Sequence, residues 1–267
     1  MTQLPEIIKK VKTLASECGK FIRDEADNFN IDNVKVKGLN DFVSDVDLNA
    51  EKILVRGLAD ILPEAGFITE EGTSTEENRT LLWVIDPLDG TTNFIHGLPP
   101  YSISIGLRKG EEIIAGVVYV ISSDEMFYGW KDGGSWLNNR RISVSNAGKI
   151  SDMLVATGFP FKDYDRLDSY LKCLRYFISN THGVRRLGSA AVDLAYVACG
   201  RFDGFFEYNL NPWDITAGTL LIREAGGIVT DFKGIGKDLT GEEIIASNPA
   251  VFNAFQTAVG EFMNSEN

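Results

Sequence analysis

The chain has 267 residues, with 26 lysines and arginines against 38 aspartates and glutamates, and therefore a net charge of −12 at neutral pH. Its length predicts one large domain or two intimately packed ones. The acidic excess argues against binding to nucleic acid or to an anionic membrane, because phosphate groups select lysine and arginine. Three widely spaced cysteines and two histidines, with no Cys-x-x-Cys pair, exclude a structural zinc site, so the cysteines are expected to be reduced.

The start of the chain is amphipathic and rich in lysine, and it lacks the apolar stretch of a secretory leader. The longest apolar run, 113–121, is far too short to cross a membrane. We therefore expect a cytoplasmic protein without a membrane partner.

The first half of the chain predicts two helices followed by a β-meander. Apolar residues recur at helical spacing over 7–22, and a second helix is expected over 48–62, before Pro63. The apolar run 81–85 indicates a buried strand that Pro87 ends. Four further strand-like runs, separated by turn residues, predict an antiparallel meander: 102–107, 113–121, 125–130 and 141–144.

The last third of the chain alternates helical patterns with short strands, which indicates an α/β half. We therefore expect an N-terminal α+β half, 1–146, and a C-terminal α/β half, 147–267, within one compact unit. The expected helices are 164–179, 189–199, 215–224 and 249–262, and the expected strands lie near 184 and over 202–207, 227–231 and 244–247.

The most informative stretch is Trp-Val-Ile-Asp-Pro-Leu-Asp-Gly-Thr-Thr-Asn at 83–93. Gly90 permits a sharp turn after the strand, so that Asp86 and Asp89 can point at one place. Two carboxylates at close range repel each other unless a cation lies between them, and Mg²⁺ prefers such ligands. The N–H groups of Gly90 and Thr91 suit an anion. Ligands for metal beside donors for phosphate are what metal-assisted phosphoryl transfer requires.

Each acidic feature also has a purely structural interpretation. A single Asp-x-x-Asp-Gly is more often a turn with a solvated acid, because aspartate and glycine are common turn residues. Glu70 fits a surface loop, Asp47 fits a helix cap, and Asp214 fits an acid in a first helical turn. Only their joint occurrence indicates a shared site.

Other phosphate and hydrolase motifs fit less well. Asp45-Val-Asp47 fails the aspartyl-phosphate pattern at its last position and does not follow an apolar strand. Gly236-Lys237 lacks the upstream glycine of a P-loop, and the chain has no G-x-S-x-G and no G-x-G-x-x-G segment.

The motif at 83–94, with Glu70 upstream and Trp-Asp-Ile-Thr-Ala-Gly at 213–218 downstream, resembles the inositol monophosphatase family. These phosphatases depend on magnesium and are sensitive to lithium. The resemblance extends from the first helix to Gly227, and segments 37–43 and 186–191 are similar to the bacterial branch. It implies an α/β fold built as a layered α-β-α-β-α sandwich, and hydrolysis of a phosphate monoester, foremost myo-inositol 1-phosphate.

The resemblance also implies the roles of individual residues. Two to three Mg²⁺ ions would bind, with Mn²⁺ as a substitute and Ca²⁺ and Li⁺ as inhibitors. Thr91, hydrogen-bonded to Asp47, would activate the attacking water, and Glu70 would approach a third ion through water. The implied metal ligands are Glu70, Asp86 and the Leu88 carbonyl for the first ion, and Asp86, Asp89 and Asp214 for the second. The implied substrate contacts are Gly90 and Thr91 for the phosphate, Glu207 for vicinal hydroxyls, and Gly188, Ser189 and Ala190 beside the sugar.

Two alternatives stay open. The same chemistry could act on fructose 1,6-bisphosphate, histidinol phosphate, NADP or a 3′-phosphonucleotide, although Glu207 favours a polyol with adjacent hydroxyls. The chain could instead be a non-catalytic metal-binding regulatory protein, since a fold alone does not settle function. By analogy with the family, we expect a homodimer.

Overall fold

The structure is a computed structural model that describes residues 4–27, 35–38, 41–43, 45–74, 79–160, 164–237 and 239–264. Its helices are α1 (Leu4–Ala26), α2 (Asp45–Ile61), α3 (Thr91–Ile95), α4 (Leu167–Asn180), α5 (Ala190–Ala198), α6 (Pro212–Glu224) and α7 (Phe252–Met263), with a short 3₁₀ helix at Ile150–Asp152. No helix formed by the described residues has the length and apolar composition needed to span a bilayer.

The strands form two large sheets and one small hairpin. A seven-stranded sheet has the order β3-β4-β5-β6-β7-β8-β9, in which only the β3–β4 pair is parallel. Its strands are β3 (Gly66–Thr69), β4 (Leu81–Asp89), β5 (Ser102–Lys109), β6 (Glu112–Val120), β7 (Glu125–Trp130), β8 (Gly134–Leu137) and β9 (Arg140–Ile142).

A mixed five-stranded sheet has the order β11-β10-β12-β14-β13. Its strands are β10 (Leu154–Thr157), β11 (Gly183–Arg185), β12 (Gly204–Tyr208), β13 (Ile228–Thr230) and β14 (Glu243–Ser247), and the hairpin consists of β1 (Lys35–Gly38) and β2 (Asp41–Val43).

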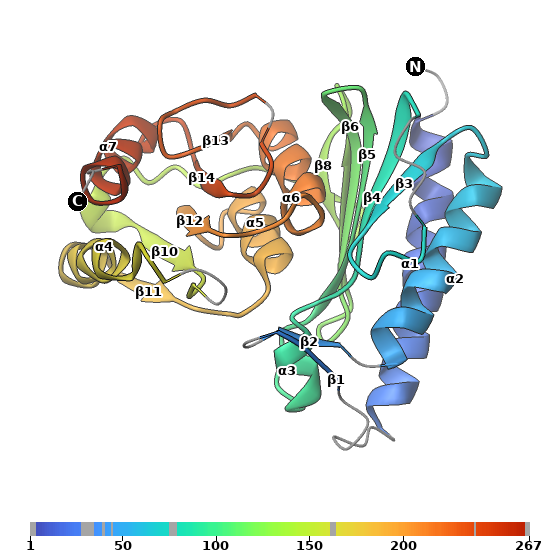
Figure 1. Ribbon diagram of the computed structural model, residues 1–267. Coiled ribbons are helices and arrows are strands. Elements are labelled where there is room, and N and C mark those ends of the chain that lie inside the picture. Colours follow the sequence, from blue (N-terminus) through green and yellow to red (C-terminus); the bar gives the residue numbers. More distant parts are fainter. Residues whose placement is uncertain are drawn as a thin grey trace.

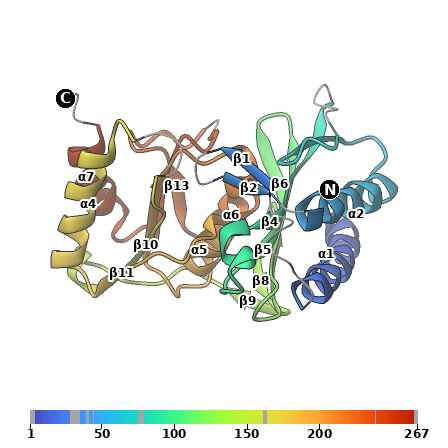
Figure 2. The same ribbon diagram turned by 60° about the horizontal axis from the view of Figure 1, so that its bottom comes forward.

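Helices and sheets alternate in five layers (Figures 1 and 2). α1 and α2 cover one face of the seven-stranded sheet, α5 and α6 lie between the two sheets, and α4 and α7 cover the outer face of the five-stranded sheet. The predicted α-β-α-β-α sandwich is therefore confirmed. The division into two halves near residue 147 stays a prediction.

Four gaps separate the five layers, and three apolar clusters fill them, because one cluster lies on both faces of the α5–α6 layer. α1 buries one stripe of residues at helical spacing, including Val11, Ala15 and Cys18. α5 and α6 are buried almost all round because a sheet covers each side of their layer, and their sequences are accordingly rich in alanine and other apolar residues. Cys18 and Cys173 are buried free thiols, and Cys199 is a half-buried one, as the cysteine spacing predicts.

α6 lies unusually close to the seven-stranded sheet because β5 and β6 present glycines to it. Gly106 and Gly116 are directly opposite each other in the two strands. A Cβ atom at Gly106 would lie 2.4 Å from Thr216 Cγ2, and one at Gly116 would lie 2.8 Å from the Ala217 carbonyl oxygen. Neither clash is tolerable, so this glycine pair sets the position of α6 on the sheet.

The structure corrects several boundaries. α2 begins at Asp45, so Asp47 lies inside the first turn and is not the cap. β4 continues through Pro87 to Asp89, because a register shift in its pairing with β5 accommodates the proline. Strands β3, β8 and β10 and the small hairpin β1–β2 were not predicted from the sequence.

Candidate active site

A bulge in β4 brings two of the predicted acids together. Residues three apart on a regular strand face opposite sides. Here Asp86 pairs with Ser104 of β5, and Asp89 pairs with Ser102, so β4 holds one residue more than its partner across this step. The extra residue restores the same face for both carboxylates. The Leu88 N–H donates to Asp86 Oδ1 at 2.9 Å, which fixes the first carboxylate within the bulge.

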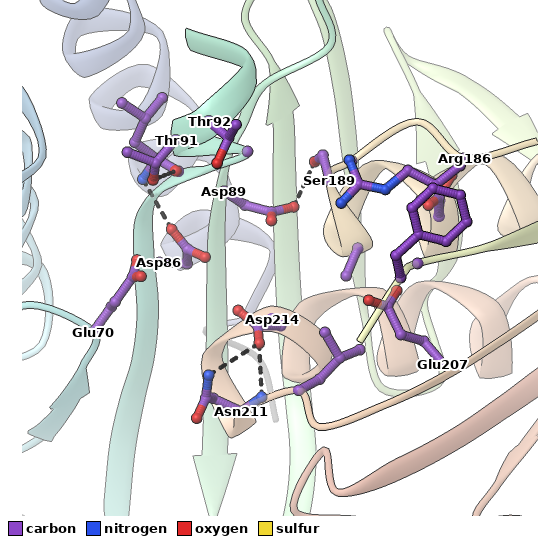
Figure 3. Close-up of a pocket in the computed structure, with 18 of the residues that line it drawn as sticks. Glu70, Asp86, Asp89, Thr91, Thr92, Arg186, Ser189, Glu207, Asn211 and Asp214 are labelled. Carbon is purple, nitrogen blue, oxygen red and sulfur yellow. Dashed lines mark hydrogen bonds between the residues drawn. The ribbon is translucent and has the colours of Figure 1, made fainter. Parts of the chain in front are cut away.

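The third carboxylate belongs to a residue far along the chain from the first two. Asp214 lies in the first turn of α6, where its Oδ2 accepts from the Asn211 backbone N–H at 2.7 Å. This capping box and Pro212 at the first helical position explain why the helix begins here. Asp86, Asp89 and Asp214 form the carboxylate cluster, in which one oxygen of each lies within 4.8 Å of the others (Figure 3).

The cluster is electrostatically unfavourable by itself. Burial raises the pKa of Asp86 well above its usual range, and the charges of Glu70, Asp89 and Asp214 raise it further. Burial also raises the pKa of Asp89 to about 6, against hydrogen bonds from Ser189 and Ala191 that lower it. Buried acids that repel one another in this way fit a hard cation, because a divalent ion would favour their charged forms. The donor set, all oxygen, fits Mg²⁺.

Glu70 stands beside the cluster at the end of β3. Its backbone N–H donates to the Ile85 carbonyl at 3.3 Å, which continues the β3–β4 pairing by one residue. The turn that follows is held by Glu51 of α2, a fully buried acid whose carboxylate accepts from the backbone N–H groups of Glu71 and Thr73 at 2.7 and 2.8 Å. The sequence analysis missed this role of Glu51.

Thr91 connects the cluster to Asp47. Its Oγ1 lies 3.1 Å from Asp47 Oδ1 and 3.0 Å from the Leu88 carbonyl oxygen. Asp47 is fully buried and does not line the pocket, and Thr91 connects it to the site. The predicted contact between Thr91 and Asp47 is therefore present.

The turn at Gly90 is fixed by its backbone and by its neighbours. Gly90 has φ +92°, and a Cβ atom there would lie 3.1 Å from the Pro100 carbonyl and 3.2 Å from the Gly188 carbonyl. Asn93 in α3 donates to the carbonyls of Pro100 and Leu187 at 2.7 and 2.8 Å. These bonds hold the segment that contains Gly188, Ser189 and Ala190 against α3. Ser189 then donates to Asp89 Oδ2 at 2.5 Å.

The opposite side of the pocket is mixed in charge and carries Arg186 and Glu207 (Figure 3). Together with three further lining residues they form what we call the substrate wall: Gly158, Phe159, Arg186, Asp193 and Glu207. Burial raises the pKa of Glu207 to about 8, while Arg186 lowers it. A Cβ atom at Gly158 would lie 1.7 Å from Glu207 Oε1, so only glycine leaves room for this carboxylate. The Arg186 guanidinium lies 5.4 Å from the centroid of the Phe159 ring.

One pocket of about 350 Å³ unites almost every predicted residue. Apart from Asp47, all of them line it: Glu70, Asp86, Leu88, Asp89, Gly90, Thr91, Gly188, Ser189, Ala190, Glu207 and Asp214. Arg186, Asp193 and Gly158 also line it but were not predicted. The first two lie within the segments 186–191 and 189–199, where a charged residue in an otherwise apolar run was the available signal.

The fold and the carboxylate cluster together are those of an α/β protein with a candidate site for a divalent metal ion. A model of the inositol monophosphatase family matches residues 3–261. The chain belongs to the inositol monophosphatase family, whose members are generally metal-dependent and act on small-molecule phosphates.

Named relatives fall into two groups. An inositol-1-monophosphatase of Rhizobium meliloti is 41% identical over 254 residues, which are 95% of this chain and 92% of that protein. A putative Nus factor SuhB of Neisseria meningitidis is 47% identical over 225 residues, 83% of this chain and 86% of that protein. Among solved structures, the inositol monophosphatase of Anabaena matches with a TM-score of 0.85 and 32% identity over 97% of each chain.

Proposed function

We propose that this protein is a Mg²⁺-dependent phosphomonoesterase that hydrolyses myo-inositol 1-phosphate to inositol and phosphate. The observation that carries the proposal is one pocket in which the carboxylate cluster faces Glu207. The first is a ligand set for a divalent cation, and the second is a hydrogen-bond acceptor for hydroxyl groups. The family supports the reaction class, and the R. meliloti relative supports the substrate.

The residues that would hold Mg²⁺ are those of the cluster together with Glu70 and the Leu88 carbonyl. We expect two ions here and a third, weaker one near Glu70, with Mn²⁺ as a substitute and Ca²⁺ and Li⁺ as inhibitors. When bound, Mg²⁺ lowers the pKa of a water molecule and neutralises charge that develops on the phosphate.

Thr91 and Asp47 supply the proton path in this proposal. The threonine hydroxyl donates to Asp47 Oδ1, so its oxygen is turned to accept a hydrogen bond from the attacking water. Because Asp47 is buried and held in the first turn of α2, the direction of this bond is fixed. The water would attack phosphorus in line with the departing inositol oxygen, so that one P–O bond forms as the other breaks and no phosphorylated protein residue forms. The proton that the water loses would pass to Thr91 and Asp47, and the departing oxygen would take up a proton from solvent.

Substrate contacts come from both sides of the pocket. The N–H groups of Gly90 and Thr91, at the start of α3, face the phosphate, and Glu207 accepts from two adjacent hydroxyls of the ring. Gly188, Ser189 and Ala190 lie beside the ring. A nucleotide 3′-phosphate would offer Glu207 no such pair of hydroxyls, whereas fructose 1,6-bisphosphate remains the principal rival substrate.

Phosphate release from a panel of esters tests the proposal. The panel is inositol 1-phosphate, fructose 1,6-bisphosphate, histidinol phosphate, NADP and a 3′-phosphonucleotide, each with and without Mg²⁺. Wild type is compared with Asp89→Asn and with Asp60→Asn, which removes an exposed acid of α2. We expect Mg²⁺-dependent release from inositol 1-phosphate that only Asp89→Asn abolishes. Preference for another ester would overturn the substrate, and no release from any ester would overturn the reaction.

The names of relatives favour a second candidate function. Proteins called Nus factor SuhB are 40–47% identical to this chain, so a regulatory role that needs a partner and no catalysis is the alternative. Expressing Asp89→Asn in a strain that lacks the gene separates the two. Restored growth without phosphatase activity would establish the regulatory role, and failure would favour catalysis.

We also propose a homodimer, on family analogy. Light scattering during gel filtration is expected to give twice the 29.5 kDa mass of the chain. A mass of one chain would refute this.

A further inference from the structure

A second pocket, of about 310 Å³, shares no lining residue with the active site. It lies where α6 meets the β5–β6 hairpin and the segment that joins β13 to β14. In Figure 1, α6 stands between the sheet that contains β5 and β6 and the sheet that contains β13 and β14. The pocket includes Gly236-Lys237, which the proposed function does not use.

The close packing of α6 explains why a cavity opens here. Gly106 faces α6, and Arg108, two residues further along β5, faces the same way. The pairing of β5 with β6 shifts at this point, because Leu107 pairs with Ala115 and Arg108 with Ile113, which leaves Ile114 as an extra residue. Arg108 and Ile113 therefore lie side by side as one wall, opposite the C-terminal part of α6.

Two buried polar atoms of this pocket lack a partner. Thr219 is fully buried, and its Oγ1 makes no hydrogen bond with any described residue. Arg108 Nε is likewise buried and unpaired within the described part of the chain. Buried polar groups are nearly always hydrogen-bonded, so each orphan requires an explanation. Arg108 and Thr219 line the same cavity, so one ligand bound there would account for both unpaired atoms.

The charge of the pocket identifies the class of ligand. Arg108, Arg223 and Lys237 contribute three positive charges in a chain whose net charge is −12. The two acids of the lining are Glu111 and Glu112, at the turn of the hairpin. Glu112 is already paired with Lys131, which lies outside the pocket.

The remaining geometry agrees with a bound oxyanion. Arg223 Nη2 donates to the Gly236 carbonyl at 2.6 Å, which fixes its guanidinium beside the segment that carries Lys237. Guanidinium groups present several donors in a plane and match the oxygens of phosphate or carboxylate. Three cations favour a dianion over a single carboxylate. Ile113, Ile215 and Leu239 offer an apolar surface for the rest of the molecule.

We propose that this pocket binds a small molecule that carries a phosphate group, held by Arg108, Arg223 and the Thr219 hydroxyl. The proposal does not depend on the proposed function, because none of its residues lines the active site.

Binding of inorganic phosphate to the metal-free protein tests the proposal. Titrations followed by calorimetry are made in EDTA, in which the carboxylate cluster repels phosphate, with acetate as the competing anion. We expect saturable binding of phosphate in wild type and in Asp89→Asn. Arg108→Met should weaken it at least about tenfold, as loss of a charge-assisted hydrogen bond predicts. Arg140→Met, which removes an exposed arginine of β9, should bind phosphate as wild type does.

Thr219→Val provides a test that does not depend on the stability of the arginine variant. Valine has the shape of threonine without its hydroxyl, so the variant should melt at a higher temperature than wild type in the absence of phosphate. Added phosphate should also raise the melting temperature of this variant by less than it raises that of wild type. The proposal is overturned by the absence of saturable binding, by equal affinity in Arg108→Met and wild type, by loss of binding in Asp89→Asn, or by tighter binding of acetate.

Discussion

The carboxylate cluster and the substrate wall face the same pocket, but their charges are balanced differently. Every group that acts on Asp86 raises its pKa. On the substrate wall, Arg186 lowers the pKa of Glu207 and of Asp193, although burial raises both. Arg186 also lowers the pKa of Asp89, so its charge reaches one member of the cluster, whereas burial and the neighbouring acids all raise the pKa of Asp86.

This contrast suits the two sides of the pocket to different tasks, the binding of a cation on one side and the orientation of a substrate on the other. An acid such as Asp86, which is buried among other acids, is suited to bind a cation from solution. A wall that contains both signs of charge is suited to orient a neutral polyol through hydrogen bonds. The contrast can be broken at either side by single substitutions.

Asp86→Asn should produce the largest effect, and in opposite directions for activity and stability. We expect kcat to fall on the order of 10³-fold or more, because a ligand shared by both proposed ions is lost. In EDTA the variant should melt at least about 2–4 °C higher, since one buried repelling charge is removed. Calorimetry and phosphate release measure both, with Asp60→Asn as the control. A lower melting temperature would contradict the repulsion within the cluster.

Thr91→Ala should lower kcat by about 10²-fold and change KM little, because the hydroxyl is proposed to act on the attacking water and not on the ester. Thr91→Ser should recover most of the activity, since it keeps the oxygen that lies 3.1 Å from Asp47. Steady-state kinetics on inositol 1-phosphate make the comparison. An equal loss in the serine and alanine variants would show that the methyl group, and not the hydroxyl, matters.

Glu207→Gln should change how stability depends on pH in the metal-free protein. The native pKa of Glu207, about 8, lies above the usual glutamate value of 4.5, so the native state holds more protons than the unfolded state between these values. Its contribution to stability is therefore lost as pH rises through that window. Denaturant titrations should show that the free energy of unfolding falls less between pH 5 and pH 8 in the variant than in wild type. An equal loss of unfolding free energy in the variant and wild type would show that a group other than Glu207 causes this pH dependence.

Phe159→Ala should have the smallest effect. The ring is 49% exposed and contacts the Arg186 guanidinium at 5.4 Å, an interaction worth about 0.5–1 kcal/mol at exposed sites. We expect KM for inositol 1-phosphate to rise about two- to fivefold with kcat unchanged. Phe159→Leu should behave like the alanine variant if the π-face matters, and like wild type if only apolar contact matters.

Much of the fold follows from local pattern. The buried stripe of α1 and the apolar strands of the meander could be predicted because their apolar patterns are regular and extend over many residues. β3, β8 and β10, of four residues each, were missed, although the predicted strands β11 and β13 are shorter still, so length alone does not decide which strands a local pattern marks. The continuation of β4 through Pro87 was also missed, since the register shift that admits a proline exists only once β5 is in place.

The site was predictable to the extent that its residues lie in contiguous motifs. Asp86, Asp89 and Thr91 share one segment, and the family resemblance supplied Asp214 and Glu207. Glu51 and Gly158 act through contacts with residues far away in the chain, and no local pattern marks such partners. Asp47 was considered as a cap, a role that its neighbours in sequence suggest and that its contact with Thr91 replaces.

The glycine pair under α6 has a practical consequence for redesign. Gly106 and Gly116 have no chemistry of their own, yet they set the depth at which the helix bearing Asp214 is seated. The position of Asp214 relative to Asp86 and Asp89 therefore depends on two residues that are not ligands. An engineer who wishes to retune the cation preference would leave both glycines in place and vary the side chains that pack on them, Thr216 and Ala217.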